Sequence, residues 1–221
     1  AQGMPADVDL ASLDGTNGFR IDGTDREFAG SAVSQAGDLN GDGVDDLVIG
    51  ADFAGRDYVI YGQLPTEAVT RIGGAASQTI QGGRFADTLK GLAGDDVLIG
   101  HNGGDRLFGG GGADTLDGGL GKDRFHLGRL ADSAVDAPDL IVGLEDIDKI
   151  HLARIDADAT QDGDQAFHLA TAFTGQAGEL VVSFDADSSL TSVLGDVDGD
   201  GVADLVLHLA GDHSGFTNFV L

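Results

Sequence analysis

Aspartates recur every nine residues in the middle of the chain, and each follows a glycine by five positions. The aspartates are Asp87, Asp96, Asp105, Asp114 and Asp123. The preceding glycines are Gly82, Gly91, Gly100, Gly109 and Gly118, and four units carry another glycine three residues later, at Gly94, Gly103, Gly112 and Gly121. Glycine accepts positive φ, so a tight turn can point carbonyl oxygens and a carboxylate at one place. Hard oxygen ligands of this kind suit Ca²⁺. The pattern therefore predicts several calcium ions, bound by these aspartates and glycines.

A large apolar residue stands two positions after each aspartate. These residues are Leu89, Leu98, Leu107, Leu116 and Phe125. The unit reads G-G-x-G-x-D-x-U-x, and its last three residues are long enough for a short strand whose apolar side chain points inward. Two units then make one turn of eighteen residues, with apolar side chains stacked on two walls. Calcium is expected between adjacent turns, shared by the pairs Asp87 and Asp105, Asp96 and Asp114, and Asp105 and Asp123.

The repeat has irregular positions. Phe85 replaces the fourth glycine of the first unit, and Leu92 and His101 replace second glycines. One unit upstream, Gln78 stands where the aspartate belongs, so this unit is expected to cap the solenoid and to bind calcium weakly or not at all. A flexible Gly-rich linker is the alternative, but a linker needs no apolar residue at every ninth position.

Two acidic loops outside the repeat have a second kind of spacing. The first contains Asp38, Asn40, Asp42 and Asp46, with Val44 as a carbonyl donor. The second contains Asp196, Asp198, Asp200 and Asp204, with Val202 in the same role. Oxygen side chains at alternate positions before a glycine can wrap one cation, so each loop is predicted to bind calcium. The alternative is a polar hairpin turn without metal.

The composition excludes several classes of function. The 221 residues carry 38 acidic and 12 basic side chains, a net charge of −26. This charge argues against nucleic acid and anionic membrane surfaces as partners. The chain has no cysteine, so metal would have to stabilise it where disulfides cannot. No apolar stretch is long enough for a membrane span, and no cleavable signal peptide is recognisable. Export is expected to use another route.

Three segments are expected along the chain, all of them β. Residues 4–62 form strand-like runs at 19–21, 32–35, 47–50 and 58–61, and residues 73–126 form the parallel β-roll. Residues 127–221 return to an ordinary composition with further strand-like runs, which predicts a β-sandwich-like domain covering the open end of the roll. The first segment resembles one FG-GAP repeat, an antiparallel blade unit of β-propellers. Because one blade leaves edges unprotected, a fragment of a longer protein is favoured over a cap on the roll.

The nine-residue unit is that of RTX proteins, and the succession DRFHLG, APDLIVGLEDIDKIHLARIDAD, ELVVSFD and GDVDGDGVADLVLHLAG resembles the C-terminal domain of serralysin-type metalloproteases. The resemblance covers residues 73 to 221. It implies a calcium-loaded module of a secreted, extracellular bacterial protein that leaves the cell through a type I (ABC transporter) channel. It also implies an uncleaved C-terminal signal, here Asn218, Phe219, Val220 and Leu221, in which Asn218 replaces the usual acidic residue. A terminal edge strand is the other interpretation of these residues.

The sequence lacks the zinc-protease and serine-hydrolase motifs. H-E-x-x-H is absent, no two of the six histidines lie three or four apart, and G-x-S-x-G is absent. The prediction is a non-catalytic, calcium-induced folding and export module. Two alternatives stay open. One is an adhesive or polysaccharide-binding module, in which an extracellular glycan would contact Arg84, Lys90, Arg106, Lys122 and Arg124. The other is the tail of a secreted serralysin-like or polysaccharide-modifying enzyme.

Overall fold

The computed structural model describes residues 29–37, 39, 44–51, 56–62, 64–65 and 67–221. The chain divides into two compact units, Ala1–Leu64 and Pro65–Leu221. We describe each unit by itself. No helix in the described ranges has the length and apolarity of a membrane span.

The first unit contains a three-stranded antiparallel sheet in the order β1-β2-β3. Its strands are β1 (Ala29–Gly37), β2 (Asp46–Ala51) and β3 (Arg56–Ile60). Ile49 of β2 is buried. The strand-like runs at 32–35, 47–50 and 58–61 fall on these three strands, while the run at 19–21 lies outside the described residues.

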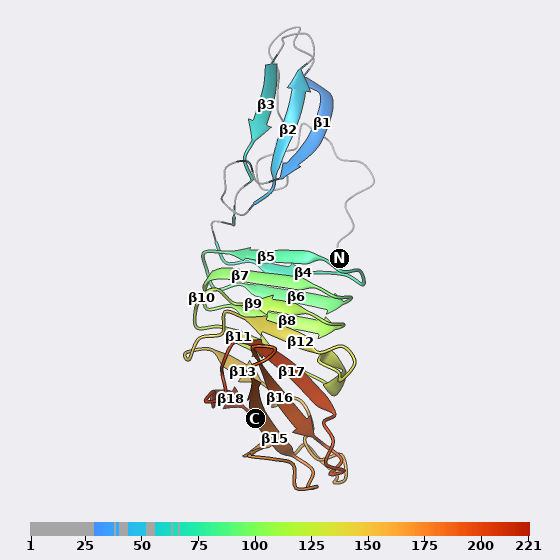
Figure 1. Ribbon diagram of the computed structural model, residues 1–221. Helices are drawn as coiled ribbons and strands as arrows, with labels where there is room; N and C mark the ends of the chain where they lie inside the picture. Colours follow the sequence, from blue (N-terminus) through green and yellow to red (C-terminus); the bar gives the residue numbers. More distant parts are fainter. Residues whose placement is uncertain (1–28, 38, 40–43, 52–55, 63, 66) are drawn as a thin grey trace. The chain divides into compact units, whose positions relative to one another are not determined.

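The second unit begins as a parallel β-roll, in which the successive strands β4 to β9 alternate between two sheets (Figure 1). The strands are β4 (Thr70–Ile72), β5 (Thr79–Gly83), β6 (Thr88–Ala93), β7 (Val97–Gly103), β8 (Arg106–Gly111), β9 (Thr115–Asp117), β10 (Leu120–Gly121) and β11 (Arg124–His126). Leu89 of β6 pairs with Leu107 of β8, and Leu98 of β7 pairs with Leu116 of β9. The eighteen-residue turn and the two apolar walls are therefore confirmed.

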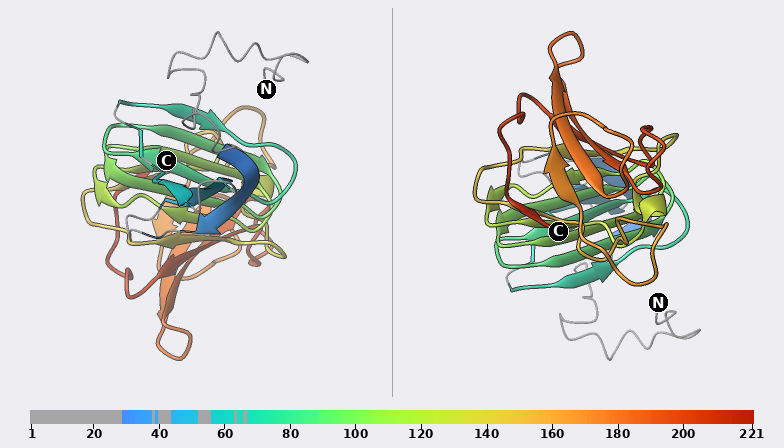
Figure 2. Two further views of the ribbon diagram at one scale, coloured as in Figure 1. Left: turned by 90° about the horizontal axis from the view of Figure 1, so that it is seen from above. Right: turned by 90° about the horizontal axis from the view of Figure 1, so that it is seen from below.

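The two sheets continue beyond the glycine-rich repeat. The later elements are the 3₁₀ turn η2 (Leu130–Asp132) and strands β12 (Asp139–Val142), β13 (Lys149–His151), β14 (His168–Ala170), β15 (Glu179–Asp185), β16 (Leu190–Asp196), β17 (Leu205–Ala210) and β18 (Phe219–Val220). One sheet has the order β18-β13-β11-β8-β6-β4, and we call it the six-stranded sheet. The nine-stranded sheet has the order β10-β7-β9-β12-β17-β16-β15-β14, with β5 beside β7. The strands β15 to β17 pair antiparallel, and in Figure 2 this part of the sheet extends away from the roll strands.

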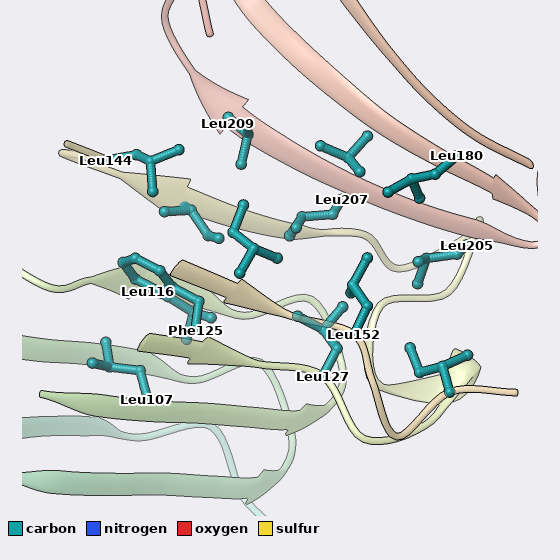
Figure 3. Close-up of a cluster of buried hydrophobic side chains, with 14 of the residues drawn as sticks. Leu107, Leu116, Phe125, Leu127, Leu144, Leu152, Leu180, Leu205, Leu207 and Leu209 are labelled. Carbon is teal, nitrogen blue, oxygen red and sulfur yellow. The ribbon is translucent and has the colours of Figure 1, made fainter. Parts of the chain in front are cut away.

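One apolar core runs through the whole second unit, between the two sheets. It begins at Ile80, includes Leu107 and Phe125, and extends to Leu207 and Phe216. Figure 3 shows how the roll residues meet the leucines of the later strands. Because strand side chains alternate between faces, each repeat contributes one residue to this core, and its neighbours in the strand face outward. The all-β fold class is confirmed, whereas the boundary between residues 126 and 127 stays a prediction.

Candidate metal centre

The aspartates of the repeat form two vertical ladders along the roll. The backbone N–H of Asp87 donates to Oδ1 of Asp105 at 2.7 Å, and that of Asp105 donates to Oδ1 of Asp123 at 2.8 Å. On the other side of the roll, the N–H of Asp96 donates to Oδ1 of Asp114 at 2.7 Å. All five carboxylates are buried, with at most 1% of each residue exposed. The fold thus stacks the predicted metal-ligating aspartates one above another, in the pairs that the sequence indicated.

The second carboxylate oxygen, Oδ2, is hydrogen-bonded differently in the interior aspartates and at the ends of the ladders. Among the described residues, no hydrogen-bond partner reaches the buried Oδ2 atoms of Asp96, Asp105, Asp114 and Asp123. At the start of the roll, Oδ2 of Asp87 accepts the N–H of Gly83 at 2.6 Å. A buried, unpartnered anionic oxygen is costly. These four interior Oδ2 atoms therefore have no hydrogen-bond partner in the part of the protein that the structure describes.

The first glycine of each unit is required for a reason that the sequence analysis did not anticipate. We expected positive φ at the first, second and fourth glycines of the unit. It occurs at second and fourth positions, for example at Gly110 (φ 107) and Gly112 (φ 130), but not at the first glycines. At the first position, glycine is required because there is no room for a Cβ atom. A Cβ on Gly118 would lie 2.5 Å from Oδ2 of Asp123 and 2.7 Å from its Cβ. A Cβ on Gly100 would lie 2.5 Å from the carbonyl oxygen of Gly118 in the next turn.

Two aspartates that the sequence analysis did not assign continue the ladders. The N–H of Asp114 donates to Oδ1 of Asp139, and the N–H of Asp123 donates to Oδ1 of Asp148, both at 2.9 Å. Both aspartates are buried and lie nine residues apart, each two residues before a buried isoleucine. This D-x-U spacing was the available signal, together with Gly143 five residues before Asp148, whereas Ala134 takes the glycine position before Asp139. Oδ2 of Asp148 accepts the N–H of Glu145 at 2.8 Å, so a backbone group closes this end.

Gln78 occupies the corresponding place at the start of the roll. Its Oε1 accepts the N–H of Gly74 at 2.9 Å, as Asp87 accepts the N–H of Gly83. The N–H of Gln78 donates to Oδ1 of Asp96 at 2.9 Å, so this unit joins the ladder. A neutral amide therefore stands where the repeat has a carboxylate, in agreement with the expected cap.

Burial raises the pKa values of five ladder carboxyl groups, those of Asp105, Asp114, Asp123, Asp139 and Asp148. The pKa of Asp105 rises to about 7 and that of Asp139 to about 8, in both cases chiefly through desolvation. Hydrogen bonds from the backbone act in the opposite direction, and neighbouring carboxylates such as Asp123 add to the rise at Asp105. The pKa of Asp114 rises to about 6 for the same reasons. Without cations, the ladder therefore disfavours its own ionised form.

The acidic loop after β16 gathers three of its four predicted ligands. Within the described residues, Asp196, Asp198 and Asp204 each place one carboxylate oxygen within 4.8 Å of the others, while Asp200 is not part of the group. Two backbone hydrogen bonds hold the turn of this loop. The N–H groups of Gly199 and Gly201 donate to the carboxylate of Asp196 at 2.7 and 2.9 Å. Val202 is 63% exposed.

The corresponding loop of the first unit is described only in part. Asp38, Asn40 and Asp42 lie outside the described residues, and Val44 is half-buried just before β2. Asp46 is buried, and its Oδ2 accepts the N–H of Leu39 at 2.7 Å, seven residues earlier. Asp204 accepts the N–H of Val197 at 2.9 Å over the same separation. The last aspartates of the two loops thus share one hydrogen-bonding pattern.

The last residues of the sequence add a strand to the six-stranded sheet. Phe219 pairs in parallel with Ile150, and Val220 pairs with His151. The side-chain amide of Asn218 donates to the carbonyl of Asp148, and Leu221 packs against the core. The interpretation of these residues as a terminal strand is confirmed, and their role as a secretion signal stays a prediction.

The comparisons with known proteins agree with this architecture. The AlgE6R3 subunit of the Azotobacter vinelandii mannuronan C5-epimerase is 25% identical, with a TM-score of 0.51, over 72% of this chain and 82% of that one. The AlgE6R2 subunit of the same enzyme is 24% identical, with a TM-score of 0.48, over 72% of this chain and 92% of that one. No curated protein matches.

A family model extends the resemblance toward the N-terminus. The model described as the peptidase M10 serralysin C terminal matches residues 30–221. The match begins well before residue 73, where the sequence analysis placed the start of the resemblance, and it includes the three-stranded sheet of the first unit. The likeness of that unit to an FG-GAP repeat finds no support in the comparisons and stays a prediction. The chain belongs to the peptidase M10 serralysin C-terminal family.

Proposed function

We propose that this chain is a calcium-dependent folding and export module of a secreted bacterial protein. The observation that carries the proposal is the set of buried carboxylate oxygens without a partner, at Asp96, Asp105, Asp114 and Asp123. Each belongs to an interior rung of the roll, where a cation between neighbouring turns would be shared by two rungs. The end members, Asp87 and Asp148, use backbone N–H groups instead.

The donor set fits calcium. Carboxylate oxygens and the carbonyl oxygens of glycine turns are hard ligands, and the chain offers no thiol as a competing soft donor. The raised pKa values of Asp105 and Asp114 show how unfavourable their ionised forms are in the metal-free fold. A bound divalent cation would remove this cost and offset part of the net charge of −26.

The charge pattern supports a switch between an unfolded and a folded chain. Where calcium is scarce, as in the cytosol, the stacked carboxylates oppose folding and keep the chain able to thread through a transporter. Where calcium is plentiful, as outside the cell, each site adds RT ln(1 + [L]/Kd), or about 2.7 kcal/mol at a hundredfold excess over Kd. Several sites on shared rungs make folding steep in calcium concentration.

The acidic loops would add ions of a second kind. Asp196, Asp198 and Asp204 would hold one cation, with the carbonyl of Val202 completing the set, and their proximity supports this site. The loop containing Asp46 would hold another, because Asp46 shares the hydrogen-bonding pattern of Asp204. We assign no catalytic role to either loop or to the roll.

The remaining elements of the proposal concern partners. Membership of the serralysin C-terminal family supports a type I secretion apparatus as the export partner, with the signal in Asn218, Phe219, Val220 and Leu221. It also supports an extracellular location and attachment to a larger secreted protein, whose catalytic or adhesive part would lie elsewhere.

A calcium titration of the chelator-treated chain tests the proposal. Far-UV circular dichroism and calorimetry, recorded together, should show a cooperative gain of β-structure as several ions bind. Equal β content in chelator and in millimolar calcium would contradict the switch. Export is tested separately by co-expression with a type I transporter and measurement of the chain in the medium. Removal of residues 218–221 should retain the chain in the cell, and unchanged export would contradict the assigned signal.

A further inference from the structure

Among the strands of the second unit, Lys and Arg occur in only one of the two sheets. The strands of the six-stranded sheet contain five Lys or Arg residues and no Asp or Glu. These residues are Arg71, Lys90, Arg106, Arg124 and Lys149. The strands of the nine-stranded sheet contain no Lys or Arg at all. In a chain with a net charge of −26, this separation of charge singles out the outer face of the six-stranded sheet.

The register places three cations directly beside one another on this face. Arg106 pairs with Arg124, and Arg124 pairs with Lys149 in the neighbouring strand. Each lies next to a core residue in its strand, so its side chain faces outward. Like charges on adjacent strands are mutually destabilising. No ion pair within the described part of the chain offsets them, since the salt bridge found there joins Arg129 and Asp132.

A second column on the same face is aromatic. Lys90 lies over the ring of Phe108, with Nζ 5.2 Å from the ring centroid. Phe108 stacks on His126, and His126 stacks on His151, with centroids 4.4 Å apart in both pairs. Burial lowers the pKa of His126 to about 4, and the nearby His151 and Arg106 lower it further. The imidazole is therefore uncharged at neutral pH, and the rings of the column stack on one another beside the row of cations.

A pocket of about 290 Å³ lies beside the aromatic column. Its lining includes Lys90, Phe108 and His126, and Arg129 and Arg154 contribute further cations. The one carboxylate in its lining, Asp132, already accepts hydrogen bonds from the backbone of Gly128 and from the guanidinium of Arg129. The pocket therefore keeps an excess of positive charge that its own residues do not neutralise.

Leu92 adds a large apolar side chain to the lining of this pocket. Its φ is 83° at a position where the repeat has glycine, and its side chain is 50% exposed. A leucine in the left-handed region is strained, and an exposed side chain gains little from packing that would offset the strain. The same conformation recurs at the second position of later units, at His101 (φ 72°), Gly110 (φ 107°) and Gly119 (φ 82°), so the turn of the roll imposes it.

We propose that the outer face of the six-stranded sheet binds a carboxylated polysaccharide, with one uronate carboxylate in the pocket near Lys90 and Arg154. Parallel strands lie about 4.8 Å apart, which is close to the length of one pyranose unit. The row of Arg106, Arg124 and Lys149 therefore offers about one cation for each sugar.

The spacing of charges along the ligand favours a carboxylated polysaccharide over a nucleic acid. Double-stranded DNA carries a phosphate about every 1.7 Å along its axis. The sheet supplies only one cation per strand in this row, and the acidic remainder of the protein repels a dense polyphosphate. The site goes beyond the folding and export role, and it differs from the set of basic residues considered from the sequence. Arg84 and Lys122 lie outside the strands of this sheet, so they are not part of the site.

The test uses the full calcium-loaded chain and short oligogalacturonates, because short oligomers avoid calcium gels. All solutions are dialysed against one calcium buffer, and binding is followed by calorimetry and by NMR shifts. We expect binding that weakens with salt. In the double variant Lys90→Gln/Arg154→Gln, the affinity should fall about tenfold or more. The matched control Arg84→Gln/Lys122→Gln removes the same charge from the turns and should bind like the parent.

Each other outcome overturns the proposal. Equal losses in the two double variants would mean a diffuse charge effect, and unchanged affinity in Lys90→Gln/Arg154→Gln would mean calcium-bridged contact elsewhere. Tighter binding of single-stranded DNA or of anionic lipid vesicles than of oligogalacturonate would assign the face to phosphate. Circular dichroism and calcium affinity of every variant separate these results from a failure of folding, which would concern the folding role instead.

Discussion

The backbone N–H of Asp123 donates to Oδ1 of Asp148 at 2.9 Å, and the two residues are 25 positions apart. Within the repeat, the same hydrogen bond spans 18 positions, as between Asp105 and Asp123. The ladder thus continues past the glycine-rich units into sequence with ordinary composition. There the second carboxylate oxygen is satisfied by the N–H of Glu145. The roll therefore ends on a carboxylate held by the backbone, while its interior carboxylates lack such a partner.

This difference predicts distinct effects for two equivalent substitutions. Asp105→Asn removes a carboxylate with an unpartnered Oδ2, so fewer calcium ions should bind and the folding midpoint should move to higher calcium. Asp148→Asn disturbs only the bond from Glu145, so it should lower the free energy of unfolding by about 1–3 kcal/mol with an unchanged number of ions. Calorimetry and urea unfolding in saturating calcium measure both. Equal loss of ions in the two variants would contradict the distinction.

Alanine at the first glycine of a unit should be poorly tolerated. Gly118→Ala would place a Cβ 2.5 Å from Oδ2 of Asp123, and the resulting displacement should cost about 1–3 kcal/mol as well as calcium affinity. Gly111→Ala is the matched control, because its Cβ would meet nothing closer than the carbonyl of Ala131 at 4.0 Å. Thermal unfolding with and without calcium compares the two. A Gly118→Ala variant as stable as Gly111→Ala would contradict the packing argument.

The stability of the metal-free chain should fall as the pH rises from 6.5 to 8. The pKa values of Asp105 and Asp139 are raised to about 7 and about 8, against about 3.9 in the unfolded chain. In this window the folded state binds more protons than the unfolded state, so the free energy of unfolding decreases with pH. The opposing contribution of His126, whose pKa is lowered to about 4, is confined to pH values below about 6.5.

Far-UV circular dichroism in chelator checks this prediction, because the β-structure that remains without calcium should be greater at pH 6.5 than at pH 8. Calcium affinity should rise over the same interval because protons and calcium compete for the carboxylates. Stability that increases with pH in chelator would contradict the raised pKa values.

Leu92→Gly should stabilise the protein although it removes a large side chain. Leu92 has φ 83°, so glycine relieves strain of about 1–2 kcal/mol. The control is Leu120→Gly, since Leu120 is also exposed but is not among the residues with positive φ. That substitution should lower stability by about 0.5–1 kcal/mol. If Leu92→Gly lowers the stability as much as Leu120→Gly does, the backbone at Leu92 is not strained and the prediction is wrong. The Leu92→Gly variant should also bind oligogalacturonate more weakly, because Leu92 lines the pocket.

The nine-residue register alone determined the roll. Gly82 to Phe125 carry a local rule, in which each turn, carboxylate and core residue repeats at a fixed spacing, so pairs such as Leu89 with Leu107 follow without knowledge of the rest of the chain. The acidic loop after β16 was also recognisable, because its carboxylates lie close together in the sequence.

Only the tertiary structure placed the later rungs and the charged face. Asp139 and Asp148 join the ladders across loops that break the spacing, so their positions depend on how those loops fold back. The segregation of Arg106, Arg124 and Lys149 onto one sheet appears only when strands distant in sequence lie side by side. The need for glycine at Gly118 was likewise hidden, because it arises from a close contact between backbone and carboxylate and not from a backbone angle.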